Sequence, residues 1–454
     1  MCTGTTSRVS RRARACCQHR QCVEATSRHL WLVERLAAAS LIAASAVFLF
    51  LALCERTRED LALLIAALYA FGTGSFSMTS QTLWEQTATQ FFLAAALLCI
   101  VRAERAPVWL WWAGAALAGA TAVRPADLLI TAPMGCYLLV RHRRGFVRVL
   151  LGGMAPTLAW LAHNYANFGM LIGSDRGAGY FAAYVFGFPY FKGLLVMLLG
   201  PSSGLFVFSP FLVVALVGVG HAWRHGPPLL RWLSVCPVLL ASLYARYIFW
   251  DGGWSYGPRF LLDVTAILCL FLVTPLEWIA KRRGARLGFL ALGVVSVGIH
   301  TLGAYFFDPA WDGRLTMMEE AYDRRCRWRD SQIPHHVRHA YRRLNALRAS
   351  WGRSADSART PDRLAARYEA DTSPRRVRAG DALAIPVRAV NTGGATWLDK
   401  PPGYQEAVRL CWRMVPPAEP GDCTLRIGLV SEQVVFFHDR GVPQLQVAVH
   451  VTAP

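Results

Sequence analysis

About ten apolar runs of near-spanning length occupy the first two thirds of this chain, and they constrain its fold more than any other feature. Hydrophobic residues make up 54% of the chain and charged residues 17%, a balance that is unusual for a soluble enzyme. We therefore predict a mainly α fold, a polytopic transmembrane helix bundle of about ten spans. The runs are residues 32–54, 61–78, 87–102, 107–122, 127–140, 149–163, 204–222, 229–249, 261–279 and 286–307.

The basic residues lie at alternate ends of these runs. The net charge of +19 could suggest a nucleic-acid partner, but cytoplasmic loops of membrane proteins carry an excess of Lys and Arg. The loop at 141–148 holds four arginines, and the loop at 281–286 holds three arginines and a lysine. The loops between them are poor in cations and rich in aromatic, Gly and Ser residues. We therefore expect the chemistry on the outer face of an inner membrane, and no nucleic-acid partner.

The first thirty residues conflict with this alternation. The alternation places the N-terminus outside the membrane. Residues 1–30 nevertheless carry six arginines, and such positively charged segments normally stay in the cytoplasm. One interpretation is a noncleaved basic leader with one span miscounted. The other, which we favour, is a truncated or misread start that lacks an upstream span.

The sequence changes character after residue 307, and we predict four parts. Residues 1–30 form the basic tail, 31–307 the transmembrane domain, 308–373 a basic linker, and 374–454 a periplasmic β-sandwich. The Arg-rich linker is expected to form amphipathic helices over 317–328 and 337–351. Its charge either binds anionic head groups or is solvated.

Alternating apolar residues predict the strands of the last part. Its pattern resembles immunoglobulin-like modules appended to exported bacterial proteins. The separation of Cys411 and Cys423 allows a disulfide but does not show its geometry. The expected strands are 382–390, 408–414, 424–430, 434–437 and 445–451.

The loop at 250–260, with sequence Trp-Asp-Gly-Gly-Trp-Ser-Tyr-Gly-Pro-Arg-Phe, is the densest polar and aromatic segment. A guanidinium can hold a phosphate through two parallel hydrogen bonds, and an aromatic ring can stack on a sugar. We therefore expect Arg259 to bind a phosphate and Trp254 or Tyr256 to stack on a sugar. The alternatives stay open: Asp251 and Asp263 pair with Arg259 or Arg246, and the aromatic residues form an interfacial belt. Further predicted substrate contacts are Arg124, Arg176 and Lys192.

Taken in order, the cation-poor loops resemble the polytopic GT-C glycosyltransferases that use polyprenyl-phosphate sugars, such as protein mannosyltransferases and aminoarabinose transferases. The resemblance covers roughly residues 30–307 and depends on the order and spacing of several motifs. Those motifs are Ala70-Phe71-Gly72-Thr73 with Leu83-Trp84, Arg124-Pro125, Asn164 with Phe168-Gly169, the block at 200–210, and the loop at 250–260.

The resemblance implies an inverting transfer from a polyprenyl-phosphate sugar to an envelope glycan, lipid or protein acceptor. A carboxylate of the first outward loop would act as the base while cations hold the departing phosphate. Some relatives use a divalent cation, so a metal stays possible. This chain departs from the pattern, because the segment before Trp31 holds only Glu24 and no acidic pair. The catalytic residue is therefore unknown, with Glu85 a weak candidate.

Two other functions remain open. A noncatalytic homologue would keep the lipid-phosphate groove and serve as a binding or assembly subunit. A transporter or flippase would require charged or broken helices at mid-membrane, or an inverted repeat, and the sequence shows neither convincingly.

Overall fold

The computed structural model describes residues 6–172, 185–250, 252–253, 255–308, 311, 326–350, 364–378, 385–393, 408–414, 421–431, 435–436, 438 and 442–452. The chain divides into two compact units, Met1–Arg338 and His339–Pro454, and each is described by itself. The first unit is helical and the second holds a small region of strands, so the mainly α prediction is confirmed at this level.

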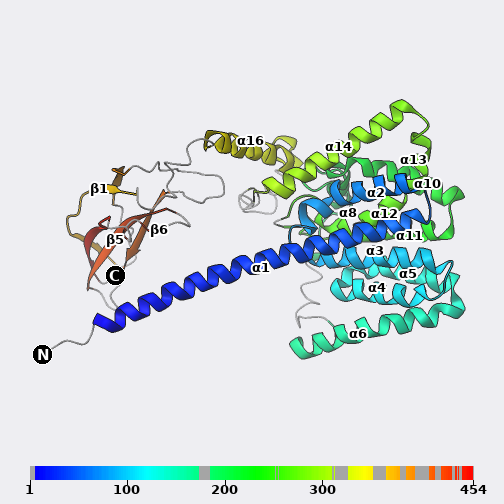
Figure 1. The fold of residues 1–454 in the computed structure, drawn as a ribbon, viewed down its shortest axis with the longest axis horizontal. Helices are drawn as coiled ribbons and strands as arrows, with labels where there is room; N and C mark the ends of the chain where they lie inside the picture. Colours follow the sequence, from blue (N-terminus) through cyan, green and yellow to red (C-terminus); the bar gives the residue numbers. More distant parts are fainter. Residues whose placement is uncertain are drawn as a thin grey trace. The chain divides into compact units, whose positions relative to one another are not determined.

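The apolar runs are all helical, but many of the helices are short or broken (Figure 1). The helices are α1 (Thr6–Cys54), α2 (Glu59–Phe71), η1 (Ser75–Thr79), α3 (Glu85–Ala103), α4 (Trp109–Val123), η2 (Pro125–Asp127), α5 (Leu128–Arg141), η3 (Arg143–Gly145), α6 (Phe146–Phe168), α8 (Tyr190–Leu199), α9 (Leu205–Phe208), η4 (Pro210–Leu212), α10 (Val213–His225), α11 (Pro228–Ala245), η5 (Arg259–Val264), α12 (Thr265–Leu270), α13 (Val273–Ile279), α14 (Arg283–Phe306), η7 (Trp328–Asp330) and α16 (Gln332–Ser350).

The prediction of ten spans is wrong. Among the described residues, five helices are long and apolar enough to cross a membrane, or six if the pair Arg259–Leu270 and Val273–Ile279, bent by 56°, is one span. A 13-residue helix such as α2 rises only about 20 Å, short of the roughly 30 Å of a bilayer core. The five helices are Leu30–Cys54, Glu85–Ala103, Arg143–Phe168, Pro228–Ala245 and Arg283–Phe306.

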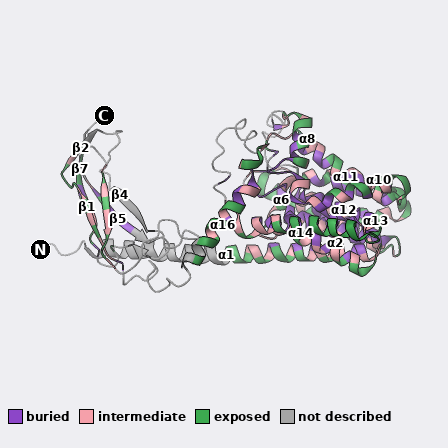
Figure 2. Ribbon diagram, turned by 90° about the horizontal axis from the view of Figure 1, so that it is seen from above, coloured by how far each residue is buried: buried purple, intermediate pink, exposed green. Residues whose placement is uncertain are grey.

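Close helix packing depends on glycines at the contact between α4 and α6. A Cβ on Gly114 would lie 1.9 Å from the carbonyl oxygen of Val149, and one on Gly152 would lie 2.0 Å from that of Trp111. Only glycine allows the two backbones this approach. The other side of α6 is apolar and exposed, and only 6% of the most apolar 18 residues of Arg143–Phe168 are buried. Figure 2 shows exposed residues along α1 and α14 as well. The exposed face of α6 suits contact with lipid.

The centre of the helical unit is also polar in places. His300 of α14 is fully buried, and its two ring nitrogens lie 2.8 Å from Ser77 Oγ and 3.1 Å from Ser209 Oγ. Gln90 of α3 accepts a hydrogen bond from Thr79 (2.8 Å) and donates one to the carbonyl of Leu262 (3.0 Å). These bonds satisfy buried polar groups and connect η1, α3, α14 and η5.

The two ends of the helical unit carry different charged groups. At one end, Arg56 pairs with Glu104 at 2.9 Å and Arg105 pairs with Glu55, all near the ends of α1 and α3. At the other end, Glu34 of α1 accepts a hydrogen bond from the backbone of Leu83 (3.1 Å), just before α3 begins. These contacts place the pairs of Glu55 and Glu104 at one end of α1 and α3, and Glu34 at the other.

The second unit contains two sheets. Strands β1 and β3 pair antiparallel, and the larger sheet has the order β2-β7-β5-β4, with β6 added to β5. Leu364, Leu429 and Val442 form a buried cluster with Tyr368 of β1 and Ala389 of β3, so side chains of the two sheets share a core. The strands are β1 (Ala366–Ala370), β2 (Arg375–Arg378), β3 (Val387–Asn391), β4 (Val408–Met414), β5 (Gly421–Ser431), β6 (Val435–Phe436) and β7 (Leu445–Thr452).

The strand register argues against a disulfide between Cys411 and Cys423. Cys411 of β4 lies opposite Gly428 of β5, whereas Cys423 lies opposite Val449 of β7. Five residues of β5 separate positions 423 and 428, about 17 Å along a strand. Disulfide-bonded residues have Cα atoms less than about 7 Å apart.

Candidate functional site

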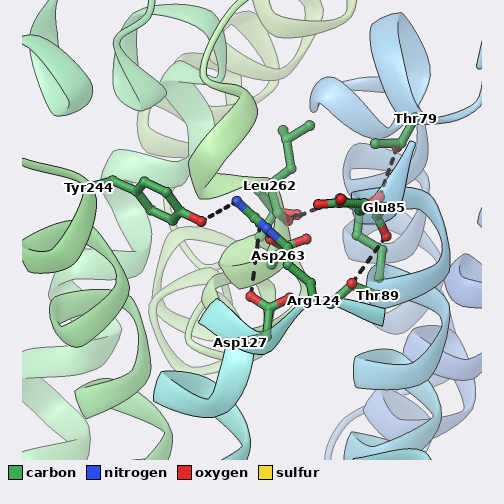
Figure 3. Close-up of polar contacts among 10 residues, drawn as sticks. Thr79, Glu85, Thr89, Arg124, Asp127, Tyr244, Leu262 and Asp263 are labelled. Atoms are coloured by element: carbon green, nitrogen blue, oxygen red, sulfur yellow. Dashed lines mark hydrogen bonds and ion pairs between the residues drawn. The ribbon is translucent and has the colours of Figure 1, made fainter. Parts of the chain in front are cut away.

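Three segments that are distant in sequence meet at the cation-poor end of the helical unit. They are the start of α3, the turn from α4 to η2, and the segment that leads into η5. Arg124 ends α4 in an extended conformation (φ −142°, ψ 101°), because the following Pro125 disfavours helix for the residue before it. Its guanidinium bonds Asp263 through Nη1 and donates to Tyr244 Oη through Nη2 at 2.6 Å (Figure 3).

Two buried carboxylates share this guanidinium. Asp127 and Asp263 are 0% and 1% exposed, and Asp127 Oδ1 lies 3.9 Å from Arg124 Nη1. Within the described part of the chain, both oxygens of Asp127 and Oδ1 of Asp263 have no hydrogen-bond partner. Burial, and then the charge of Asp263, raises the pKa of Asp127 well above its ordinary value, so the protonated form of Asp127 is favoured.

Arg259 lies in a different environment beside this group. Its guanidinium carbon is 4.0 Å from the centre of the Trp84 ring, and Nη1 donates to the carbonyl of Gly252 at 3.1 Å. Its Nε is buried without a hydrogen-bond partner, and no carboxylate of the described residues lies within ion-pair distance. A cation held in place by an aromatic ring and a carbonyl, without a carboxylate, can bind an anion.

Glu85 is a carboxylate of this region that solvent reaches. It is exposed at the first turn of α3, directly after Trp84, and its charge acts on both Arg124 and Arg259. Among the described residues, no three His, Cys, Asp or Glu side chains come together as metal ligands would. The chemistry available from these residues is anion binding by Arg259 and proton transfer by Glu85.

The other predicted contacts separate into four groups: buried, paired with another residue than expected, exposed, and outside the described residues. Tyr256 is only 2% exposed and donates to the carbonyl of Ile299 (2.9 Å), so its ring packs inside the protein and presents no face to a sugar. Asp263 pairs with Arg124 and not with the expected Arg259 or Arg246. Lys192 is exposed on α8. Asp251, Trp254 and Arg176 lie outside the described residues.

Sequence reasoning missed four residues of this region. Asp127 follows Arg124 by three positions, a spacing that could have indicated a pair. Trp84 was noted only as part of a motif, and Tyr244 lies in an apolar run where a tyrosine indicates nothing specific. Gln332 comes from the predicted linker, and no local pattern indicates its hydrogen bonds to the backbone of Ser255 and Gly257, each 2.8 Å long.

Comparison with protein-family models, with curated proteins and with solved structures finds no match to this chain. The clearest features of the described residues are Arg259, stacked on the Trp84 ring, and the neighbouring buried pair of Arg124 and Asp263, both in a unit with membrane-type helices.

Proposed function

We propose that the protein is a membrane glycosyltransferase of the GT-C type, which transfers a sugar from a polyprenyl-phosphate donor to an envelope glycan, lipid or protein. The reaction would take place on the periplasmic face of an inner membrane. The observation that carries the proposal is Arg259, which is stacked on Trp84 and has no carboxylate partner among the described residues. Its guanidinium would hold the phosphate that leaves the sugar.

An apolar hollow next to the site supports a lipid-linked donor. It has a volume of about 270 Å³ and lies among α4, α5 and α6, where Leu117, Thr121 and Leu128 form part of its wall. Thr121 precedes Arg124 by one helical turn, and Leu128 follows Asp127 directly. A phosphate near the arginines would therefore have space for apolar chain close by.

The acceptor hydroxyl requires a general base, and Glu85 is our choice for it. It is solvent-exposed and within electrostatic reach of Arg259, whereas Asp127 and Asp263 are buried against Arg124. A divalent cation stays possible as an additional ligand of the donor phosphate. The β-strand unit would form an immunoglobulin-like sandwich that contacts glycan, acceptor or a partner protein, since its two sheets share a core.

A second function is favoured by the burial of those two aspartates. Because they are unavailable as bases, the protein could bind the lipid phosphate without transferring a sugar, as a binding or assembly subunit. In this alternative Arg259 still binds the lipid phosphate, but Glu85 does not act as a general base.

The test replaces Arg259 in membranes supplied with a radiolabelled polyprenyl-phosphate sugar. Arg259→Ala should lower kcat/KM by about 10²–10³-fold, and Arg259→Lys should recover part of the loss, because lysine keeps the charge and loses the planar fork. Arg58→Ala, which changes an exposed arginine at the opposite end, is the matched control. Unchanged transfer in Arg259→Ala would sink the proposal. Binding of polyprenyl phosphate with no transfer by the wild type would select the noncatalytic function.

A further inference from the structure

Gln332, the first residue of α16, is bonded to the loop that carries Arg259. Its side chain is 1% exposed; Nε2 donates to the carbonyl of Ser255 at 2.8 Å, and Oε1 accepts from the backbone N–H of Gly257 at 2.8 Å. One amide side chain thus pairs with both backbone groups that flank Tyr256, much as a neighbouring strand would.

The loop needs such a partner because of its backbone conformation. Gly257 has φ of +77° and Gly252 has φ of +79°, so the chain turns through the left-handed region and forms no regular ladder. A Cβ on Gly257 would also lie 2.8 Å from the ring of Phe208. Buried N–H and C=O groups without partners are costly, and Gln332 satisfies one of each.

The same loop determines where Arg259 points. The backbone N–H of Arg259 donates to the carbonyl of Gly257 at 2.9 Å, and its Nη1 donates to the carbonyl of Gly252 at 3.1 Å. That second carbonyl also accepts from Ser255 Oγ at 3.3 Å. Both the backbone and the guanidinium of Arg259 are therefore bonded to the segment that Gln332 holds.

Gln332 is itself held by the residues that follow it. His336 is fully buried; its Nδ1 lies 2.7 Å from the carbonyl of Gln332, and its Nε2 accepts from the backbone N–H of Asp308 at 3.1 Å. Nδ1 therefore carries the proton and donates. The Tyr256 ring meets His336 edge to face at 5.1 Å, and His335 lies 3.0 Å from a carboxylate oxygen of Asp308. The first turn of α16 is thus fixed to the segment just after α14.

We propose that Gln332 is a positioning residue for the anion site: by pairing with Ser255 and Gly257 it fixes the loop in the conformation that presents Arg259 to a phosphate. This inference rests on the proposed function for the identity of the anion, a polyprenyl phosphate. The contact itself is independent of any reaction.

The test compares Gln332→Met, which keeps the length of the side chain and removes both hydrogen bonds, with Gln332→Glu, which keeps the acceptor for Gly257. Asn345→Met, at an exposed position of the same helix, is the matched control. In Gln332→Met, amide hydrogen exchange at Gly257 should rise at least about tenfold, and affinity for polyprenyl phosphate should fall about tenfold. The kcat for sugar transfer should fall as well, because Arg259 would hold the phosphate as it leaves, and Gln332→Glu should give an intermediate result.

Three outcomes overturn the inference or the proposed function separately. Unchanged exchange at Gly257 in Gln332→Met overturns the inference. Faster exchange with unchanged affinity for polyprenyl phosphate also overturns it, because the loop would then not control Arg259. No sugar transfer by the wild type, with the expected changes in exchange and affinity, overturns the enzymatic function and leaves the positioning role supported. If Gln332→Met does not fold, Gln332→Glu decides by the same measurements.

Discussion

The two ends of the helical unit contain the same residue types in opposite environments. At the basic end, arginines pair with Glu55 and Glu104, whose side chains are 17% and 34% exposed. At the other end, Arg124 pairs with Asp263 and approaches Asp127, with all three side chains at 5% exposure or less. Exposed ion pairs contribute little to stability, whereas buried charges are expensive to desolvate.

The difference lies in the cost of burying each group. A buried ion pair is by itself weak support for stability, because desolvation offsets much of the attraction between its charges. Removing one partner of a buried pair nevertheless costs far more than removing one partner of an exposed pair. Three experiments test this contrast, beginning with the substitution that should destabilise the protein most.

Arg124→Ala should be the most destabilising change. It leaves Asp263 buried without its cation and removes the donor to Tyr244, which should lower the free energy of unfolding by about 3–5 kcal/mol. Thermal unfolding in detergent micelles measures the effect, and Arg124→Lys serves as the charge-preserving control. A loss below about 1 kcal/mol would mean that the two ends do not differ as described.

Asp127→Asn should change how stability depends on pH. Because its pKa is raised in the folded state, the stability that Asp127 contributes is fully present below its unfolded pKa of about 3.9 and is lost as pH rises through the folded pKa. Asparagine does not titrate. Between the unfolded and folded pKa values of Asp127, the free energy of unfolding of the variant should therefore rise relative to that of the wild type by about 1 kcal/mol per pH unit. Parallel unfolding curves from pH 5 to 8 would contradict the protonated state of Asp127.

Arg56→Ala should have the smallest effect. Its pair with Glu104 is partly exposed, with side chains 29% and 34% accessible, so its removal should cost less than about 1 kcal/mol. The loss should shrink further at high salt, because exposed charges are screened. Comparing unfolding at 50 mM and 500 mM salt checks both points. A loss as large as that of Arg124→Ala would remove the contrast between the ends.

Apolar runs predicted where helices occur but not how many cross a membrane. The run at 61–78 contains a break between α2 and η1, around Gly72 and Gly74, that average hydrophobicity does not detect. Strand alternation predicted β4 and most of β7. The strand β2 was missed because three of its four residues are arginines. The strand β1 was missed although Ala366, Tyr368 and Ala370 alternate with charged residues, because it lies in the segment predicted as a basic linker.

The site was predicted only in part, because its contacts connect distant positions. Arg124, Asp263 and Arg259 were all named from sequence. That Asp263 belongs to Arg124 is a contact over 139 positions, which no local pattern reveals. Tyr256 was expected to stack on a sugar. Its ring is instead buried, and its hydroxyl donates a hydrogen bond to the carbonyl of Ile299 in α14. The burial of Tyr256 depends on contacts with distant parts of the helical unit, such as Ile299 and Phe208, so the local sequence does not predict it.

The bond between Gln332 and Gly257 also has a consequence for biosynthesis. The two residues are 75 positions apart, so a ribosome working at 5–20 residues per second needs about 4–15 s to supply the glutamine after the glycine. Throughout that interval the backbone groups of Ser255 and Gly257 must find water or temporary partners. The loop around the proposed anion site can thus reach its final conformation only after α14 and the first turn of α16 have been made, later than the synthesis of the earlier helices.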